Sequence, residues 1–210
     1  MTAKEFWEKF DKQVKLNADA LKKVWDSPTR FTSEIKKTIK MAIKEKHNDA
    51  ISYDKEDNYG FGDYVIQPEY FNIDLVAWEQ KKDSDYYNVE DGIKGYQLLK
   101  YAWDFDIAIE HENDKYLWAD EVIKLAYIYC KLRVVIGYFP YIGEDKKYKT
   151  QLEYLNEIAK VLNNLGCKEN MKCGEFMIIL GDVGGKKSCG FEKIKYTPYV
   201  YNGEEFMRME

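Results

Sequence analysis

Histidine, cysteine and proline are scarce in this 210-residue sequence, which has two, four and four of them respectively. No pair of cysteines has C-x-x-C spacing, so reduced thiols are favoured over a zinc site or disulfide bonds. His111 and Glu112 could begin an H-E-x-x-H zinc helix, but position 115 is lysine. The G-x-S-x-G, Walker A and G-x-G-x-x-G motifs are also missing, and with them three common signatures of catalytic or nucleotide-binding sites.

Long apolar runs are absent too. The most apolar stretch, residues 125–143, is interrupted by Lys131 and Arg133, and residues 1–10 lack the apolar core of a signal peptide. We therefore expect a soluble, cytoplasmic protein that does not bind membranes. The formal net charge is −5, so a nucleic-acid site would have to be a local basic patch on an acidic body. With 45% hydrophobic and 33% charged residues, the whole chain is expected to fold as one domain.

Two amphipathic helices are predicted near the start of the sequence. Thr2 and Glu5 form a capping-box pattern, and apolar residues follow at spacings of three or four until a stop before Pro28. A second helix, around residues 33–46, has similar apolar spacing with lysines between and after its apolar positions. These lysines form either a solvated surface or one that meets phosphate groups; they are Lys36, Lys37, Lys40, Lys44 and Lys46.

The remaining sequence alternates between strand-like and helix-like segments, which predicts an α/β fold with a mixed central β-sheet flanked by helices. In one predicted strand, Phe105, Ile107 and Ile109 are expected on one face and Asp106 on the other. The predicted strands cover residues 71–78, 105–112, 133–139 and 175–182. The predicted helices cover residues 89–103, 115–130 and 152–162, and a hairpin is expected at Asn202-Gly203.

Acidic residues lie inside two of the predicted strands. Asp74 is at the middle of one strand, where aspartate is unfavourable, and Glu110 and Glu112 share a face at the end of another. If these strands are neighbours, the carboxylates converge around one hard cation such as Mg²⁺ or Mn²⁺. A bound dication would activate water and neutralise charge on a phosphodiester. The alternative interpretation is a solvated rim of the sheet.

These residues resemble the motif of the PD-(D/E)XK nuclease superfamily, which has a restriction-endonuclease-like fold. In that fold, a helix precedes a mixed sheet whose second and third strands supply an acidic residue and an acid-x-lysine pair. A helix and a further strand follow. The similarity covers residues 31–139, with residues 1–30 as an N-terminal helical extension and residues 140–210 completing the sheet. The resemblance implies that Asp74 and Glu110 are the metal-binding carboxylates.

The sequence departs from this motif at Glu112, which stands where the superfamily usually has lysine. Some restriction enzymes carry glutamate there, where it is thought to activate water, and others place the lysine on the next helix, where Lys124 is the candidate. The resemblance also implies a metal ligand from the carbonyl of His111 and a further acid from Glu34. As alternatives, Lys124 and Glu34 are surface helix residues, and the His111 side chain is packed in the core.

Two other segments bear on the same chemistry. Pro68-Glu69 lies too far before Asp74 to match the superfamily's Pro-Asp pair well. The basic turn at Gly184–Lys187 follows a predicted strand, and it is either a phosphate contact or an ordinary loop.

The sequence thus predicts a metal-dependent nuclease that hydrolyses phosphodiester bonds of DNA. Asp74 and Glu110 would hold Mg²⁺ or Mn²⁺, and Glu112 or Lys124 would position or deprotonate water. The alternative is a catalytically inactive protein of the same fold that binds a protein partner or forms a homodimer, which the missing motif lysine and 18 tyrosines favour. A glycosidase is disfavoured because Glu110 and Glu112 would project in parallel and would not straddle a sugar bond.

Overall fold

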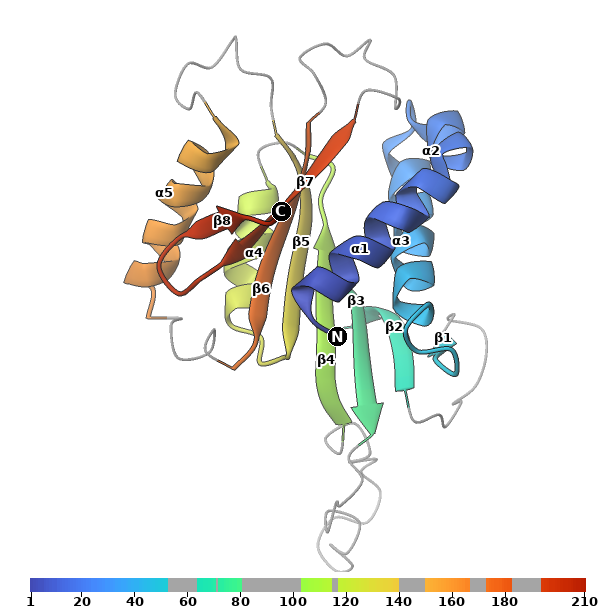
Figure 1. The fold of residues 1–210 in the computed structure, drawn as a ribbon, viewed down its shortest axis with the longest axis horizontal. Helices are drawn as coiled ribbons and strands as arrows, with labels where there is room; N and C mark the ends of the chain where they lie inside the picture. The colour runs from blue at the N-terminus through green and yellow to red at the C-terminus, as the bar shows by residue number, and fades with distance from the viewer. Residues whose placement is uncertain are drawn as a thin grey trace, which may run out of the picture.

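A computed structural model of the protein describes residues 1–52, 64–70, 72–80, 103–114, 117–139, 150–166, 173–182 and 194–210. These residues form a mixed β-sheet with helices on both of its faces, so the predicted α/β class is confirmed (Figure 1). Residues 89–102 of the predicted helix over residues 89–103 and the turn at Gly184–Lys187 lie outside the described residues, and Trp103 is in a strand and not in a helix. Cys130 is a buried free thiol, Cys173 is exposed, and the other two cysteines lie outside the described residues.

Three helices come first in the chain: α1 (Ala3–Leu16), α2 (Ala18–Val24) and α3 (Pro28–Lys44). The predicted capping box is present at the start of α1. The single first helix that the periodicity predicted is divided at Asn17, whose side-chain amide donates a hydrogen bond to the carbonyl of Gln13 at 2.9 Å. Such side-chain hydrogen bonds compete with helix propagation.

The described strands form one eight-stranded sheet in which spatial order follows chain order. Strands β2, β3 and β4 are antiparallel neighbours, whereas β4, β5 and β6 run parallel and are connected through α4 (Trp118–Ala126) and α5 (Gln151–Asn164). The strands are β1 (Ile51–Ser52), β2 (Tyr64–Tyr70), β3 (Ile73–Gln80), β4 (Trp103–His111), β5 (Leu132–Phe139), β6 (Glu175–Asp182), β7 (Lys195–Tyr201) and β8 (Phe206–Arg208). The last two form the predicted hairpin.

The sheet separates two hydrophobic cores. Helices α1 to α3 cover one face, and α4 and α5 cover the other (Figure 1). Every residue of β5 is buried, as expected for a parallel strand covered on both faces. Close packing depends on Gly137 in this strand, because a Cβ atom there would lie 2.6 Å from Cγ of Trp118 on α4.

A β-bulge interrupts the regular alternation of β4. Ala77 pairs with Ile107 but Trp78 pairs with Phe105, so Asp106 is left without a partner on β3. As a result, Phe105 packs against the core beneath α4 and α5, while Ile107 belongs to the core beneath α1 to α3. The prediction that Phe105 shares a face with Ile107 is therefore wrong, because the extra residue shifts the alternation by one.

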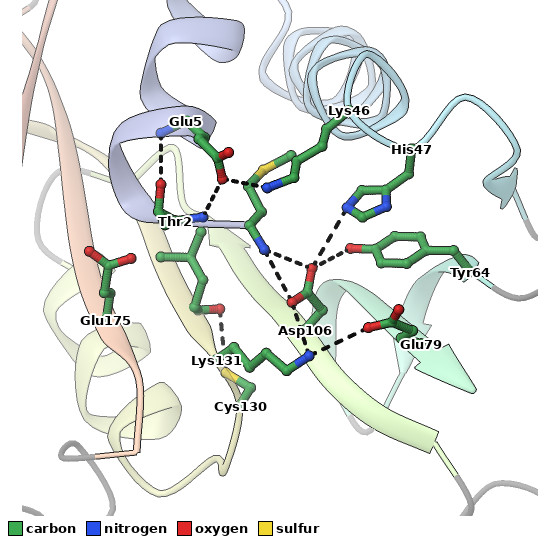
Figure 2. Close-up of polar contacts among 12 residues, drawn as sticks. Thr2, Glu5, Lys46, His47, Tyr64, Glu79, Asp106, Cys130, Lys131 and Glu175 are labelled. Atoms are coloured by element: carbon green, nitrogen blue, oxygen red, sulfur yellow. Dashed lines mark hydrogen bonds and ion pairs between the residues drawn. The ribbon is translucent and has the colours of Figure 1, made fainter. Parts of the chain in front are cut away.

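The bulge turns the buried carboxylate of Asp106 toward the start of α1 (Figure 2). Its two oxygens each lie 3.2 Å from the ammonium group of Met1, and it accepts a hydrogen bond of 2.7 Å from the hydroxyl of Tyr64. Lys131 Nζ lies 3.7 Å away, and the ring of His47, which stacks on Tyr64, lies 3.9 Å away. The buried carboxylate of Asp106 on β4 therefore joins residues next to α1 and β5, and Tyr64 of β2, in one polar cluster.

Candidate functional site at the ends of strands β2, β3 and β4

Three acidic residues form a row across adjacent strands. Leu75 on β3 pairs with Pro68 on β2 and with Ile109 on β4. The strands are antiparallel, so one residue farther toward the same end of the sheet the neighbours are Glu69 on β2, Asp74 on β3 and Glu110 on β4. The structure thus brings together the two carboxylates that the sequence singled out as metal ligands, and it adds Glu69 to them.

Backbone N–H groups hold the carboxylates of Asp74 and Glu110 in place. The amide N–H of Asp74 donates to Oε2 of Glu110 at 3.3 Å, and the amide N–H of His111 donates to Oδ2 of Asp74 at 2.8 Å. Each strand end therefore donates to the carboxylate of its neighbour. These bonds fix both side chains at the same end of the sheet.

Two lysines, one from the helix layer on each face, complete the row. Lys36 of α3 places Nζ 2.6 Å from Oε1 of Glu69 and 2.8 Å from Oδ1 of Asp74. Lys124 of α4 places Nζ 2.6 Å from Oε1 of Glu110, and it also pairs with Glu121. Each lysine thus bridges two carboxylates, while Asp74 and Glu110 lie next to each other with no lysine between them.

Two residues near the junction of β2 and β3 have unusual backbone geometry. Glu69 and Asn72 have φ angles of 52° and 59°, in the left-handed region that residues other than glycine seldom occupy. Lys124 donates a hydrogen bond of 2.9 Å to the carbonyl of Asn72 and so ties this junction to α4. Backbone strain of this kind is concentrated at functional sites.

Burial strongly perturbs the pKa of Glu110. Desolvation raises its pKa to about 8; the hydrogen bond with Lys124 opposes this shift, and the negative charge of Asp74 adds to it. Burial alone would lower the pKa of Lys124, but its hydrogen bonds with Glu110 and Glu121 outweigh that effect and the pKa is raised. The pKa of Lys36 is raised in the same way by its acidic partners.

The raised pKa of Glu110 predicts a pH-dependent stability. In the absence of metal, wild-type protein is expected to lose stability relative to Glu110→Gln as pH rises from about 4.5 to about 8, because only the unfolded state releases the proton readily in that window. Urea unfolding at several pH values in EDTA measures this difference, with Glu157→Gln on α5 as an exposed control. If the stability of wild type and of Glu110→Gln changed with pH in the same way, the raised pKa of Glu110 would be contradicted.

His111 contributes to the site through its backbone. Its ring is buried, Nε2 lies 3.0 Å from the hydroxyl of Tyr138, and Phe31 packs nearby. Burial lowers the pKa of the imidazole to about 4, so the ring is neutral near pH 7. The ring therefore lies in the core, and its amide contacts Asp74; the carbonyl as a metal ligand stays a prediction.

Glu112 and Glu34 have other neighbours. Glu112 Oε1 accepts a hydrogen bond of 2.7 Å from the amide of Asp114, and Glu34 pairs with Lys37 of its own helix at 2.6 Å. Of the two residues considered for the superfamily's lysine position, Lys124 is the one seen in contact with Glu110.

A groove of about 1160 Å³ runs beside α3 and adjoins the row of acids at Lys36. Glu112, Asn113 and Asp114 line one part of it, and Pro68 of β2 also contributes. Four of the five lysines singled out in the sequence line it: Lys36, Lys37, Lys40 and Lys44. The fifth, Lys46, instead pairs with Glu5 of α1 at 2.5 Å.

The ligand types at the row suit a hard cation, since Mg²⁺ is commonly held by one or two carboxylates together with water. Among the residues that the structure describes, no group of three or more histidine, cysteine, aspartate or glutamate side chains is arranged to hold a metal ion. Asp74 and Glu110 would thus supply two ligands, and both lysines would have to move from them.

Comparison with known proteins gives no family assignment: no protein-family model and no curated protein matches the chain. Within the described ranges, no helix has both the length and the apolar character needed to cross a membrane.

Proposed function

We propose that this protein is a metal-dependent nuclease-like enzyme that hydrolyses phosphodiester bonds of DNA. The observation that carries the proposal is the contact of Asp74 with Glu110 on adjacent strands, with Lys124 of the following helix paired to Glu110. Two carboxylates and a lysine at one sheet end are the groups that metal-assisted phosphodiester hydrolysis uses.

The order of elements supports the proposal as well. Helix α3 is followed by antiparallel strands β2 to β4, then by α4 and by β5 parallel to β4. Asp74 lies on the second of these antiparallel strands and Glu110 on the third. The resemblance to the PD-(D/E)XK superfamily implies the same order. The restriction-endonuclease-like fold is part of the proposal, with β1 and β6 to β8 as additional strands.

The residues of the site have separable roles in the proposed reaction. Asp74 and Glu110 would hold Mg²⁺ or Mn²⁺, which when bound supplies an activated water and neutralises charge on the phosphodiester. The raised pKa of Lys124 keeps it protonated, so it would donate hydrogen bonds that orient water or a phosphate oxygen. His111 would act through its amide, which orients the carboxylate of Asp74.

Metal binding tests the proposal directly. Mg²⁺ or Mn²⁺ is expected to raise the melting temperature of the wild-type protein, because a ligand that binds only the folded state stabilises it. Asp74→Ala is expected to abolish this shift, and the exposed-site variant Glu157→Ala is expected to keep it. Cleavage of labelled DNA with each metal then tests the reaction. An undiminished shift in Asp74→Ala would rule out the ligand assignment.

A second candidate function rests on the lysines. Because Lys36 and Lys124 pair with the acids of the row, part of its negative charge is compensated without a metal, which is compatible with a catalytically inactive interaction protein. For this function we expect no metal-induced shift and either a tight protein partner or a homodimer. The thermal assay tests for the metal-induced shift. Sedimentation of the purified chain tests for a homodimer, and partner capture from cell extract tests for a protein partner, so that together the three measurements separate the two candidate functions.

A further inference from the structure

The lysines beside the groove have a regular spacing. Lys36, Lys40 and Lys44 follow one another at intervals of four residues on α3, and all three line the groove. Each interval advances about 6 Å along a helix and keeps the side chains on nearly the same face. The first of these lysines bridges Glu69 and Asp74, so the line of positive charge ends at the acidic row.

We propose that this groove binds the sugar–phosphate backbone of one nucleic-acid strand, with successive phosphates beside Lys44, Lys40 and Lys36. The inference rests on the proposed function, because it leads the bound strand along α3 to Asp74 and Glu110. It specifies that function further: the substrate is held by its backbone, next to the acids, and its base sequence is not read by this groove.

Charge and chemistry of the lining favour a phosphate backbone. The lining holds four lysines and two acids, Glu112 and Asp114, so the groove has an excess of positive charge that attracts a polyanion, although the whole chain has a net charge of −5. No aromatic side chain is among the described residues that line the groove, so bases have no ring there to stack on. Lysine contacts with phosphates give affinity independent of sequence and strongly dependent on salt.

The apolar part of the lining fits the same ligand. Met41 lies one residue after Lys40 and is partly exposed, and Pro68 lines the groove from β2. Deoxyribose rings have apolar edges that can rest on such side chains while the phosphates remain beside the lysines. Lys37, paired with Glu34, lies at the side of the line and is expected to contribute less.

The experiment measures binding of a fluorescent oligonucleotide to the full chain in EDTA, across a salt series, so that hydrolysis plays no part. Lys40→Gln/Lys44→Gln is compared with a matched double variant, Lys23→Gln/Lys160→Gln, which removes two exposed lysines from α2 and α5. Loss of two phosphate contacts is expected to lower the slope of log Kobs against log salt by about 1.4 to 1.8. At about 0.1 M salt, affinity is then expected to fall about 25- to 60-fold.

The oligonucleotide is tested both as a single strand and as a duplex, and the tighter complex identifies which of them supplies the backbone. Equal losses in the two double variants, or no binding by wild type, would overturn the groove assignment. If wild type cleaves DNA but the groove variant binds normally, the inference fails and the proposed function stands. If the groove variant loses binding and wild type never cleaves with either metal, the groove stands and hydrolysis fails.

Discussion

Asp106→Ala is expected to lower the free energy of unfolding by about 3–5 kcal/mol, the usual cost of removing one partner from a buried ion pair. The substitution leaves the buried ammonium of Met1 and the hydroxyl of Tyr64 without their acceptor, and it removes the negative charge beside Lys131. Because this carboxylate connects α1 with three strands, the whole N-terminal helix layer is expected to become less stable. Urea unfolding at pH 7 measures the loss.

Two variants control for this result. Asp19→Ala changes an exposed aspartate of α2 and is expected to stay within about 0.5 kcal/mol of wild type. Asp106→Asn keeps the shape and one acceptor but not the charge, so its loss is expected to be intermediate. A second readout is the titration of His47, whose pKa is lowered by burial while Asp106 opposes the shift. In Asp106→Ala this pKa is expected to fall further; unchanged stability and titration would show that the cluster contributes little.

Asp74 and Glu110 could be selected from the sequence because each conflicts with its surroundings. A carboxylate in a predicted strand is unfavourable, and a local conflict of this kind is typical of functional or strained positions. Their contact then required only that two predicted strands be neighbours. The lysine of α4 could be proposed from the resemblance, since a helix that connects parallel strands returns across the sheet beside them.

Glu69 and Lys36 could not be selected in this way. Glu69 joins the row because Tyr70 pairs with Ile73, and this register depends on a two-residue connection that the sequence did not reveal. Recognition of Asn72 as a turn residue with positive φ would have been the signal for it. Lys36 takes part because one particular turn of α3 lies beside the sheet end, and periodicity predicts the buried face of a helix but not its position along a sheet.

Asp106 shows a different limit. The sequence of β4 alternates regularly in polarity, and that pattern predicts a regular strand. The bulge depends on how β3 and β4 pair, because one extra residue on β4 lies between the Trp78–Phe105 and Ala77–Ile107 pairs. Strand pairing is a tertiary property, so neither the bulge nor the buried cluster around Asp106 could be read from the alternation.

Lys124→Met is expected to slow metal-dependent DNA cleavage by at least about 100-fold, the usual contribution of a positioned proton donor or acceptor, whereas Glu112→Gln is expected to retain most of the activity. The reason is geometric: Lys124 contacts Glu110, while Glu112 accepts its hydrogen bond from Asp114. Single-turnover cleavage of labelled DNA, at equal concentrations of folded protein, compares the two variants. Lys160→Met on α5 is the matched control for loss of an exposed lysine.

The pH profile separates a role in the reaction from a role in folding. Glu110 has to lose its proton to hold a metal, and burial raises its pKa to about 8 while Lys124 opposes that shift. Cleavage by wild type is therefore expected to rise about tenfold per pH unit below that value. In Lys124→Met the increase in cleavage rate is expected at higher pH than in wild type, because the lysine no longer lowers the pKa of Glu110. Lys124→Arg restores a positive charge, so its pH profile is expected to lie near that of wild type. If Glu112→Gln abolishes cleavage and Lys124→Met keeps both rate and profile, water is positioned by Glu112 and the lysine of α4 is structural.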